Sequence, residues 1–155
     1  MPRAALDPVD RKILRALQSD GRAAVSELAE RVGLSTSPCF RRLRRLEEEG
    51  VIARYAAVLD QEKVGLSVSV FIQIKVTSQG EQALAQFEKT ILRWPEVLEC
   101  YLMTGPRDYL LRVVVEDVAA YEQFIKNKLT KVNGIASIES SFALRQVKHT
   151  SSLPL

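Results

Sequence analysis

The chain has 155 residues, of which 46% are hydrophobic and 26% charged, a composition typical of an ordinary globular protein. Lys and Arg outnumber Asp and Glu by only 22 to 19, so the overall charge does not by itself indicate a nucleic-acid partner. No apolar run approaches the roughly 20 residues that span a bilayer, and the first ten residues, MPRAALDPVD, lack the apolar core of a secretory signal, so we expect a cytoplasmic protein with no membrane partner.

Two short helices open the first predicted domain, residues 6–58. Asp7 suits an N-cap and Pro8 the first helical position, and Asp20-Gly21 ends this helix. Its apolar stripe consists of Val9, Ile13, Ala16 and Leu17. The second helix ends at Gly33 and carries Leu28, Ala29 and Val32 on its apolar face.

A third, strongly basic helix follows in the segment GLSTSPCFRRLRR, residues 33–45. At about 100° per residue, Cys39, Leu43 and Leu46 share one narrow sector, which we predict to be the core face. The opposite side carries Ser37, Arg41, Arg44 and Arg45, with Arg42 at its margin. For Phe40 and Arg42, phosphate contact and packing remain alternatives. Taken alone, such a helix could also be a solvated surface with internal Arg–Glu pairs.

The surroundings of the basic helix favour DNA binding over that simpler interpretation. Two short helices with a Gly-containing turn precede it, as in a helix-turn-helix. After Gly50, the segment Val51–Tyr55 predicts a strand in the position of a wing. The arginines would then face the major groove of duplex DNA, and the Ser/Thr cap would offer N–H groups to a phosphate. The predicted DNA-contact residues are Ser35, Thr36, Ser37, Arg41, Arg42, Arg44 and Arg45.

The remainder of the chain predicts a linker over 59–66, an α+β domain over 67–150 and a tail over 151–155. We expect strands over 68–76, 97–103, 109–115 and 135–147, and helices over 80–93 and 117–132. The order βαββαβ implies a ferredoxin-like sheet with both helices on one face. Phe71 and other apolar residues on the opposite face predict burial against a second copy, and therefore a homodimer.

The segment Met103–Tyr109 between two of these strands is the second candidate site. Gly105-Pro106 forces a turn, and free backbone N–H groups there could hold a carboxylate while Asp108 holds an ammonium group. Those are the two charged ends of an α-amino acid. An ordinary β-hairpin turn is the alternative.

Four segments carry a resemblance that runs nearly end to end: LDPVDRKILRALQSDGR, ELAERVGLSTSPCFRRLRRLEEEGVI, YLMTGPRDYLLRV and SSFALRQVKHTSSLPL. They are similar to those of the leucine-responsive regulatory protein/AsnC family of transcription regulators. The resemblance implies a winged helix-turn-helix joined to a ferredoxin-like regulatory domain, with homodimers that assemble into octamers or similar discs. It also implies regulation of amino-acid metabolism, modulated by an effector such as leucine or methionine.

In this family the effector binds near the TGxxDY loop, at a contact between subunits. The residues implied here are Thr104, Gly105, Pro106, Arg107, Asp108 and Tyr109, with Ser140 from the last strand. Pro106 and Arg107 fill the variable part of the loop and therefore bear on effector identity. Ala24 departs from the Ser or Thr of many relatives, which removes a helix cap worth about 1 kcal/mol.

Other functions have less support in the sequence. An RNA-recognition sheet needs aromatic residues on a central strand, whereas the candidate strand DYLLRVVVE is aliphatic. An enzyme would need a nucleophile–base pair or a carboxylate dyad, and none is evident. Cys39 and Cys100 lack CxxC spacing and His149 stands apart from other ligand types, so we expect no metal and no cofactor.

Overall fold

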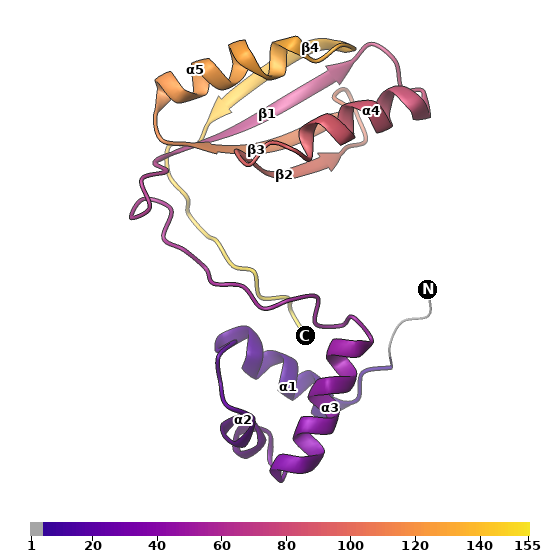
Figure 1. Cartoon of the computed structure of the whole chain (residues 1–155), viewed down its shortest axis with the longest axis vertical. Helices are drawn as coiled ribbons and strands as arrows, with labels where there is room; N and C mark the ends of the chain where they lie inside the picture. Colours follow the sequence, from indigo (N-terminus) through magenta and orange to yellow (C-terminus); the bar gives the residue numbers. More distant parts are fainter. Residues whose placement is uncertain (1–4) are drawn as a thin grey trace. The chain divides into compact units, whose positions relative to one another are not determined.

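The computed structural model describes residues 5–155 and divides the chain into two compact units (Figure 1). One unit holds the chain up to Val58 together with residues 148–155, and the other holds residues 59–147. Residues 148–150, which we predicted in the second domain, therefore cluster with the first. Residues 1–4, part of the segment in which we expected no secretory signal, lie outside the described residues. Within residues 5–155, no helix combines the length and apolar character that crossing a membrane requires.

Three helices form the first unit: α1 (Pro8–Ser19), α2 (Val25–Val32) and α3 (Thr36–Glu48). A reciprocal capping box starts α1, because the Asp7 carboxylate accepts the Asp10 N–H at 2.8 Å and the Asp10 carboxylate accepts the Asp7 N–H at 3.2 Å. Helix α2 has no side-chain cap at Ala24, as expected from its sequence. Gly33 ends α2 with φ of 74°, a left-handed conformation that favours glycine.

The core of the first unit forms where the apolar faces of these helices meet. The buried residues are Ile13, Leu14, Leu28, Ala29, Val32, Cys39 and Leu46. Cys39 and Leu46 from α3 are completely buried and Leu43 is partly buried against them, so the predicted core face of the basic helix is confirmed.

The predicted wing strand over Val51–Tyr55 does not form. This segment belongs to no sheet, although Val51 and Ile52 pack against the core and the Ile52 N–H donates to Leu46 O at 3.0 Å. A strand needs a partner for its main-chain groups, and within residues 5–58 no second extended segment pairs with it. The prediction was wrong because a β-favouring composition does not supply that partner.

The second unit is a four-stranded antiparallel sheet with its helices on one face (Figure 1). Its elements are β1 (Val68–Val76), α4 (Glu81–Ile91), β2 (Val97–Leu102), β3 (Tyr109–Val115), α5 (Val118–Asn127), a 3₁₀ turn (Leu129–Lys131) and β4 (Ile135–Phe142). The strand order β2-β3-β1-β4 confirms the ferredoxin-like βαββαβ arrangement.

Two predicted elements of this unit are shorter than expected. The helix predicted over 117–132 ends at Asn127 and is followed by the 3₁₀ turn. The strand predicted over 135–147 ends at Phe142, which pairs with Val70. Beyond the Phe142–Val70 pair, only Val68 and Ser69 of β1 remain, so later residues of the predicted strand have no pairing partner on β1.

The two faces of the sheet differ in exposure. On the helix side, alternate residues of β1 and β3 are buried, including Val70, Ile72, Leu111 and Val113. On the opposite face, Phe71 is 39% exposed and Tyr101 is 51% exposed. We refer to this second surface as the open face.

Candidate DNA interface and effector loop

The outward side of α3 carries the side chains that are available for an anionic partner. Arg41 is exposed and makes no ion pair with any residue in the range 5–155. Arg44 lies 3.6 Å from Glu48 one turn further on, but both side chains are about two-thirds exposed, 65% and 70%. Such a pair is worth about 0.5 kcal/mol or less and is easily exchanged for a phosphate.

The N-terminus of α3 is also open to an anion. Ser35 is the N-cap residue, and its hydroxyl makes no capping hydrogen bond. Among the described residues, no hydrogen bond uses the main-chain N–H of Thr36 or Ser37. Unpaired N–H groups at a helix start attract phosphate through both hydrogen bonding and the helix dipole.

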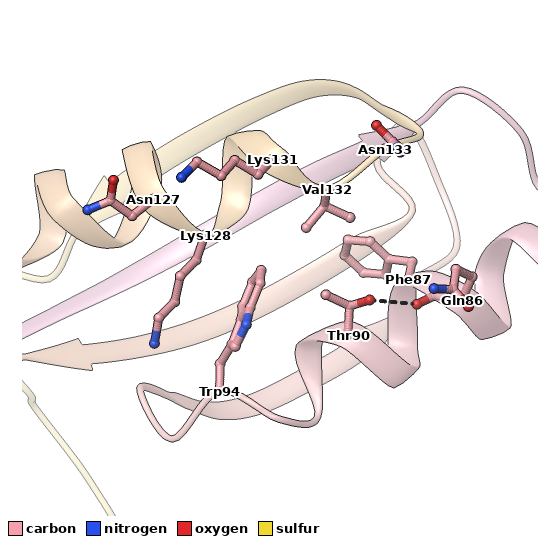
Figure 2. A pocket seen from close by; sticks show the side chains of 9 residues that line it. All are labelled: Gln86, Phe87, Thr90, Trp94, Asn127, Lys128, Lys131, Val132 and Asn133. Carbon is pink, nitrogen blue, oxygen red and sulfur yellow. Dashed lines mark hydrogen bonds between the residues drawn. The ribbon is translucent and has the colours of Figure 1, made fainter.

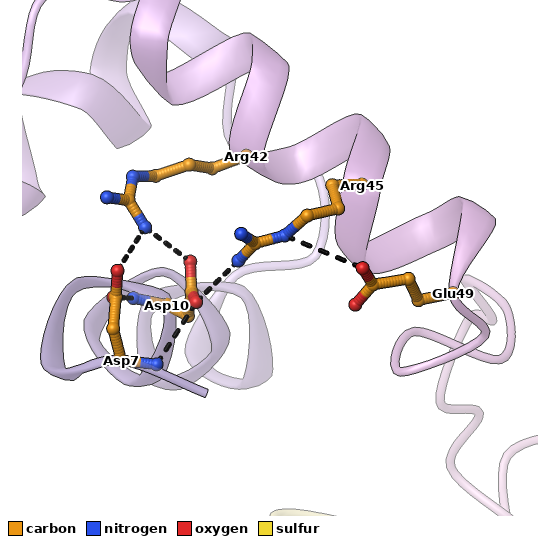
Figure 3. Close-up of polar contacts among 5 residues, drawn as sticks. All are labelled: Asp7, Asp10, Arg42, Arg45 and Glu49. Atoms are coloured by element: carbon orange, nitrogen blue, oxygen red, sulfur yellow. Dashed lines mark hydrogen bonds and ion pairs between the residues drawn. The ribbon is translucent and has the colours of Figure 1, made fainter. Parts of the chain in front are cut away.

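Arg42 and Arg45, two of the predicted DNA-contact residues, are paired with carboxylates of the same unit (Figure 3). Arg42 donates to the carboxylates of Asp7 and Asp10, and Arg45 donates to Asp10 at 2.6 Å. Asp10 is completely buried, whereas the side chains of Arg42 and Arg45 are 31% and 44% exposed. Arg45, which we predicted on the side opposite the core face, is exposed but is paired with Asp10 at the start of α1. For Arg42, the structure favours packing and ion pairing.

This ion-pair cluster ties α3 to the first turn of α1. The N–H of Asp10 and the guanidinium of Arg42 lower the pKa of Asp7 below its ordinary value, and the two carboxylates raise the pKa of Arg42. We missed Asp10 at the sequence level. The D-x-x-D spacing of a capping box was the available signal, although it would have predicted the cap and not the arginines.

A hollow of about 360 Å³ lies beside the cluster and is lined by Pro38, Arg41, Arg42 and Arg45. Three arginines line it, and the guanidinium groups of two of them, Arg42 and Arg45, are held by carboxylates. The arrangement presents positive charge in a fixed position, which suits the regularly spaced phosphates of a duplex.

The effector loop, residues 103–108, joins β2 to β3. Thr104, Gly105 and Pro106 are exposed, and Gly105 has φ of 113°, which disfavours any residue with a side chain. Among the described residues, no hydrogen bond uses the main-chain N–H of Thr104, Gly105 or Arg107. The Arg107 guanidinium donates to the side chains of Ser137 and Glu139 on β4, at 3.1 and 2.6 Å.

We expected Asp108 to hold an ammonium group, but its carboxylate is already occupied by donors of the same chain. It is 4% exposed, and it accepts hydrogen bonds from the Val76 N–H at 2.8 Å, Gln79 at 2.6 Å and Lys75 at 3.3 Å. These partners, led by the Val76 N–H, hold the pKa of Asp108 below its usual range. Residues some 30 positions away in the sequence supply the donors, so no local pattern could have revealed them.

Tyr109 also points away from the loop surface. It is 1% exposed, its ring lies 4.6 Å from that of Phe87, and its hydroxyl donates to Glu88 on α4 at 2.8 Å. Burial and the Glu88 carboxylate raise the pKa of Tyr109. Tyr109 is therefore a core residue that fixes the end of the loop.

Replacing Asp108 with alanine should destabilise the second unit, because the change leaves the Val76 N–H and the Gln79 amide without their acceptor. We expect the melting temperature to fall by several degrees. Fluorescence of Trp94, the single tryptophan of the chain and a residue of the second unit, is a suitable probe. Glu139→Ala is the control, since Glu139 is 58% exposed. Equal melting of Asp108→Ala and wild type would contradict this structural role.

Ser140 lies apart from the loop within the chain. Its hydroxyl is hydrogen-bonded to the Tyr121 hydroxyl on α5, and its register partner on β1 is Ile72, whose side chain points to the helix side. The structure therefore brings Arg107 and Asp108 to one end of the sheet and does not bring Ser140 into contact with them. Sequence alone could not place it, because its facing depends on the register of β4.

A second hollow, of about 370 Å³, lies between the C-terminal ends of α4 and α5 (Figure 2). Trp94, Phe87 and Val132 form its apolar part. Lys128 also lines it, and its Nζ donates to a Glu96 carboxylate oxygen at 2.6 Å. Its remaining lining is Gln86, Thr90, Asn127, Lys131 and Asn133. None of the predicted effector residues lines it. Nor do the residues in the range 5–155 contain a cluster of three potential metal ligands.

Comparisons with known proteins agree with both units. Residues 6–53 match a family profile described as winged helix-turn-helix DNA-binding, and residues 69–153 match one described as the Lrp/AsnC ligand binding domain. The chain is 49% identical to the Bkd operon transcriptional regulator of Pseudomonas aeruginosa over 98% of this chain and 99% of that one. It is 41% identical to the DNA-binding transcriptional activator DecR of Escherichia coli K12, over 97% of this chain and 99% of that one.

A solved structure shows the same similarity in three dimensions. It is a transcriptional regulator of Neisseria meningitidis in complex with L-methionine, 43% identical, with a TM-score of 0.92 over 97% of each chain. A helix-turn-helix unit with an exposed basic helix, joined to a ferredoxin-like unit, defines a DNA-binding regulator rather than an enzyme. The chain belongs to the Lrp/AsnC family of transcription regulators.

Proposed function

We propose that this regulator responds to an amino acid held at the effector loop and contacts DNA through the outward side of α3. The single observation that carries the effector part is the set of unused main-chain N–H groups at Thr104, Gly105 and Arg107. Three donors in one exposed turn suit a carboxylate, which accepts several hydrogen bonds at once. The L-methionine bound to the Neisseria meningitidis relative supports an amino acid as the ligand.

The ammonium end of the ligand needs a different partner from the one the sequence suggested. All three hydrogen bonds to Asp108 come from its own chain, and Glu139 is already paired with Arg107. An ammonium group would therefore displace Lys75, whose 3.3 Å contact is the longest of the three, or would be received by a second copy of the chain. The second route would make an assembled protein the form that binds.

The DNA contacts that we propose centre on Arg41 and Arg44 together with the α3 start, residues 35–37. Arg42 and Arg45 add positive charge at the hollow while remaining tied to Asp7 and Asp10. The regulated genes would belong to amino-acid metabolism, and the protein would act in the cytoplasm.

A homodimer formed through the open face of the sheet fits this proposal. Phe71 and Tyr101 lie on that face, and large exposed aromatic side chains are enriched in interfaces. Two copies would present two copies of α3 to two half-sites of an operator. Further assembly into octamers or similar discs would bring loops of different copies together.

Calorimetry with a panel of amino acids tests the effector site. We expect methionine or leucine to bind the wild-type protein, and the corresponding amide, methioninamide or leucinamide, to bind at least 10-fold more weakly. The amide retains the ammonium group and side chain but lacks the carboxylate that the loop N–H groups would hold. Equal affinity for acid and amide would contradict carboxylate capture by the loop, and no heat with any amino acid would contradict the effector role altogether.

A further inference from the structure

The segment Ser152–Leu155 lies against α1 of the first unit and makes specific contacts with it. The side-chain amide of Gln18 forms two hydrogen bonds with Leu153: its Nε2 donates to the Leu153 carbonyl at 3.1 Å, and its Oε1 accepts the Leu153 N–H. The Arg15 Nε donates to the main-chain oxygen of Leu155 at 2.7 Å. Together, the side chains of α1 bond the main chain of this segment as a neighbouring strand would.

An apolar contact adds to these hydrogen bonds. Leu155 is partly buried and packs against the core cluster of the first unit, whereas Leu153 is 68% exposed. Leu155 is therefore the leucine of this segment that anchors it to the first unit. We call residues 152–155 the strap.

The strap leaves the proposed DNA surface uncovered. Arg15 and Gln18 are three residues apart and so lie on one side of α1. No hydrogen bond or ion pair within the described residues joins residues 152–155 to α3. The strap therefore does not act by blocking Arg41 or Arg44.

The position of the strap along the chain allows it to tie the two units together. The chain leaves the first unit after Val58 and re-enters it at Lys148, so a docked strap attaches this unit to the second one through two stretches of chain instead of one. The returning stretch comes directly from β4, the strand that receives the Arg107 side chain at Ser137 and Glu139. A single flexible linker permits wide reorientation of the units it joins, and a second attachment restricts it.

We propose that residues 152–155 are a releasable strap that docks on α1 and restrains the reorientation of the DNA-binding unit. A regulatory role for the strap rests on the proposed function. The strap would link β4, to which Arg107 of the effector loop is hydrogen-bonded, with the unit that contacts DNA. The docked contacts are few, three hydrogen bonds and one leucine side chain, so ordering the strap is readily reversed.

Gln18→Ala in the full-length protein tests the strap. The substitution removes both hydrogen bonds to Leu153, and alanine is the strongest helix former, so α1 should remain intact. Lys12→Ala, an exposed position on the same helix, is the control. Amide hydrogen exchange of Leu153, whose N–H donates to Gln18 Oε1, should be at least 10-fold faster in Gln18→Ala than in wild type or control.

Nuclear spin relaxation supplies the second measurement. In wild type, the amides of the two units should show nearly the same tumbling time, and in Gln18→Ala the first unit should tumble faster than the second. Equal exchange in wild type and Gln18→Ala would overturn docking, and unchanged relative tumbling would overturn the restraint. Wild-type exchange protection that is lost on dilution would place the strap on a second copy and would also overturn the inference. Neither measurement uses DNA or effector, so failure of the proposed function gives a different result from failure of the strap.

Discussion

Replacing Arg41 and Arg44 together with alanine is expected to weaken DNA binding roughly 10- to 100-fold at low salt, since each charged hydrogen bond to a phosphate contributes about 1 kcal/mol or more. Arg41 has no ion pair in the described part of the chain, and the pair of Arg44 with Glu48 is exposed and long at 3.6 Å. Both side chains are therefore available to a phosphate at little cost.

The salt dependence of binding is the sharper measurement. Each phosphate contact contributes about 0.9 to the slope of log K against log salt, so losing two contacts per subunit should reduce that slope by about 2 per bound subunit. Binding is measured at several salt concentrations on an operator selected from random duplexes. Arg11→Ala with Lys12→Ala removes the same charge from α1 and is the control. A double substitution in α3 that leaves both affinity and slope unchanged would contradict the assignment of this side of α3.

Periodicity predicted most of the fold because it reports which residues share a face. The core residues of α3 and the buried residues of β1 both follow from it, and the βαββαβ order leaves few arrangements of the sheet. The prediction of a wing strand at Val51–Tyr55 was wrong because a strand needs a pairing partner elsewhere in the chain. Local periodicity carries no information about such a partner.

The candidate sites were harder to predict, since a charged residue does not reveal its partner. Arg45 lies opposite the core face by helix geometry, yet buried Asp10, 35 residues earlier, determines where its guanidinium goes. Asp108 likewise sits in a loop sequence typical of ligand contact, and its carboxylate is taken by donors from β1 and the turn that follows it. In both cases the fold, and not the local pattern, assigns the interaction.

The Asp10 cluster carries the largest expected effect on stability. In Asp10→Ala the first unit should lose about 2 kcal/mol, because two charged hydrogen bonds to a completely buried carboxylate disappear along with half of the capping box. For a unit of this size the loss corresponds to a fall of roughly 10 °C in melting temperature. Amide exchange of core residues in α1 and α2 reports on this unit separately from the other.

Two further substitutions separate the contributions of charge and cap. Asp10→Asn retains an oxygen for the Asp7 N–H but loses the negative charge, so we expect a smaller loss than in Asp10→Ala. Glu48→Ala is the matched control, because it removes a carboxylate from an exposed pair worth about 0.5 kcal/mol or less. If Asp10→Ala were no less stable than Glu48→Ala, the cluster would have no structural role.

Acid should weaken the same cluster through Asp7. Its pKa is lowered from 3.8 in the folded chain, so folding favours the charged carboxylate. That contribution is fully present above the ordinary carboxyl pKa and is lost as the pH falls through the lowered value. At neutral pH Asp7 is charged in both folded and unfolded chains, and assays there report on Asp10→Ala without interference from this titration.

DNA binding distinguishes a positioning role of Asp10 from general loss of stability. Asp10→Ala leaves Arg45 with only its long, exposed 3.9 Å contact to Glu49 and leaves Arg42 with Asp7 alone, which frees positive charge beside the hollow. At a temperature where the variant remains folded, its salt slope should therefore become steeper by about 1 per subunit. Its preference for operator over random duplex should fall, since phosphate contacts by an unrestrained arginine carry no sequence information. A variant that is merely less stable would bind more weakly with an unchanged slope, so the slope decides whether Asp10 sets the direction of the arginines on α3.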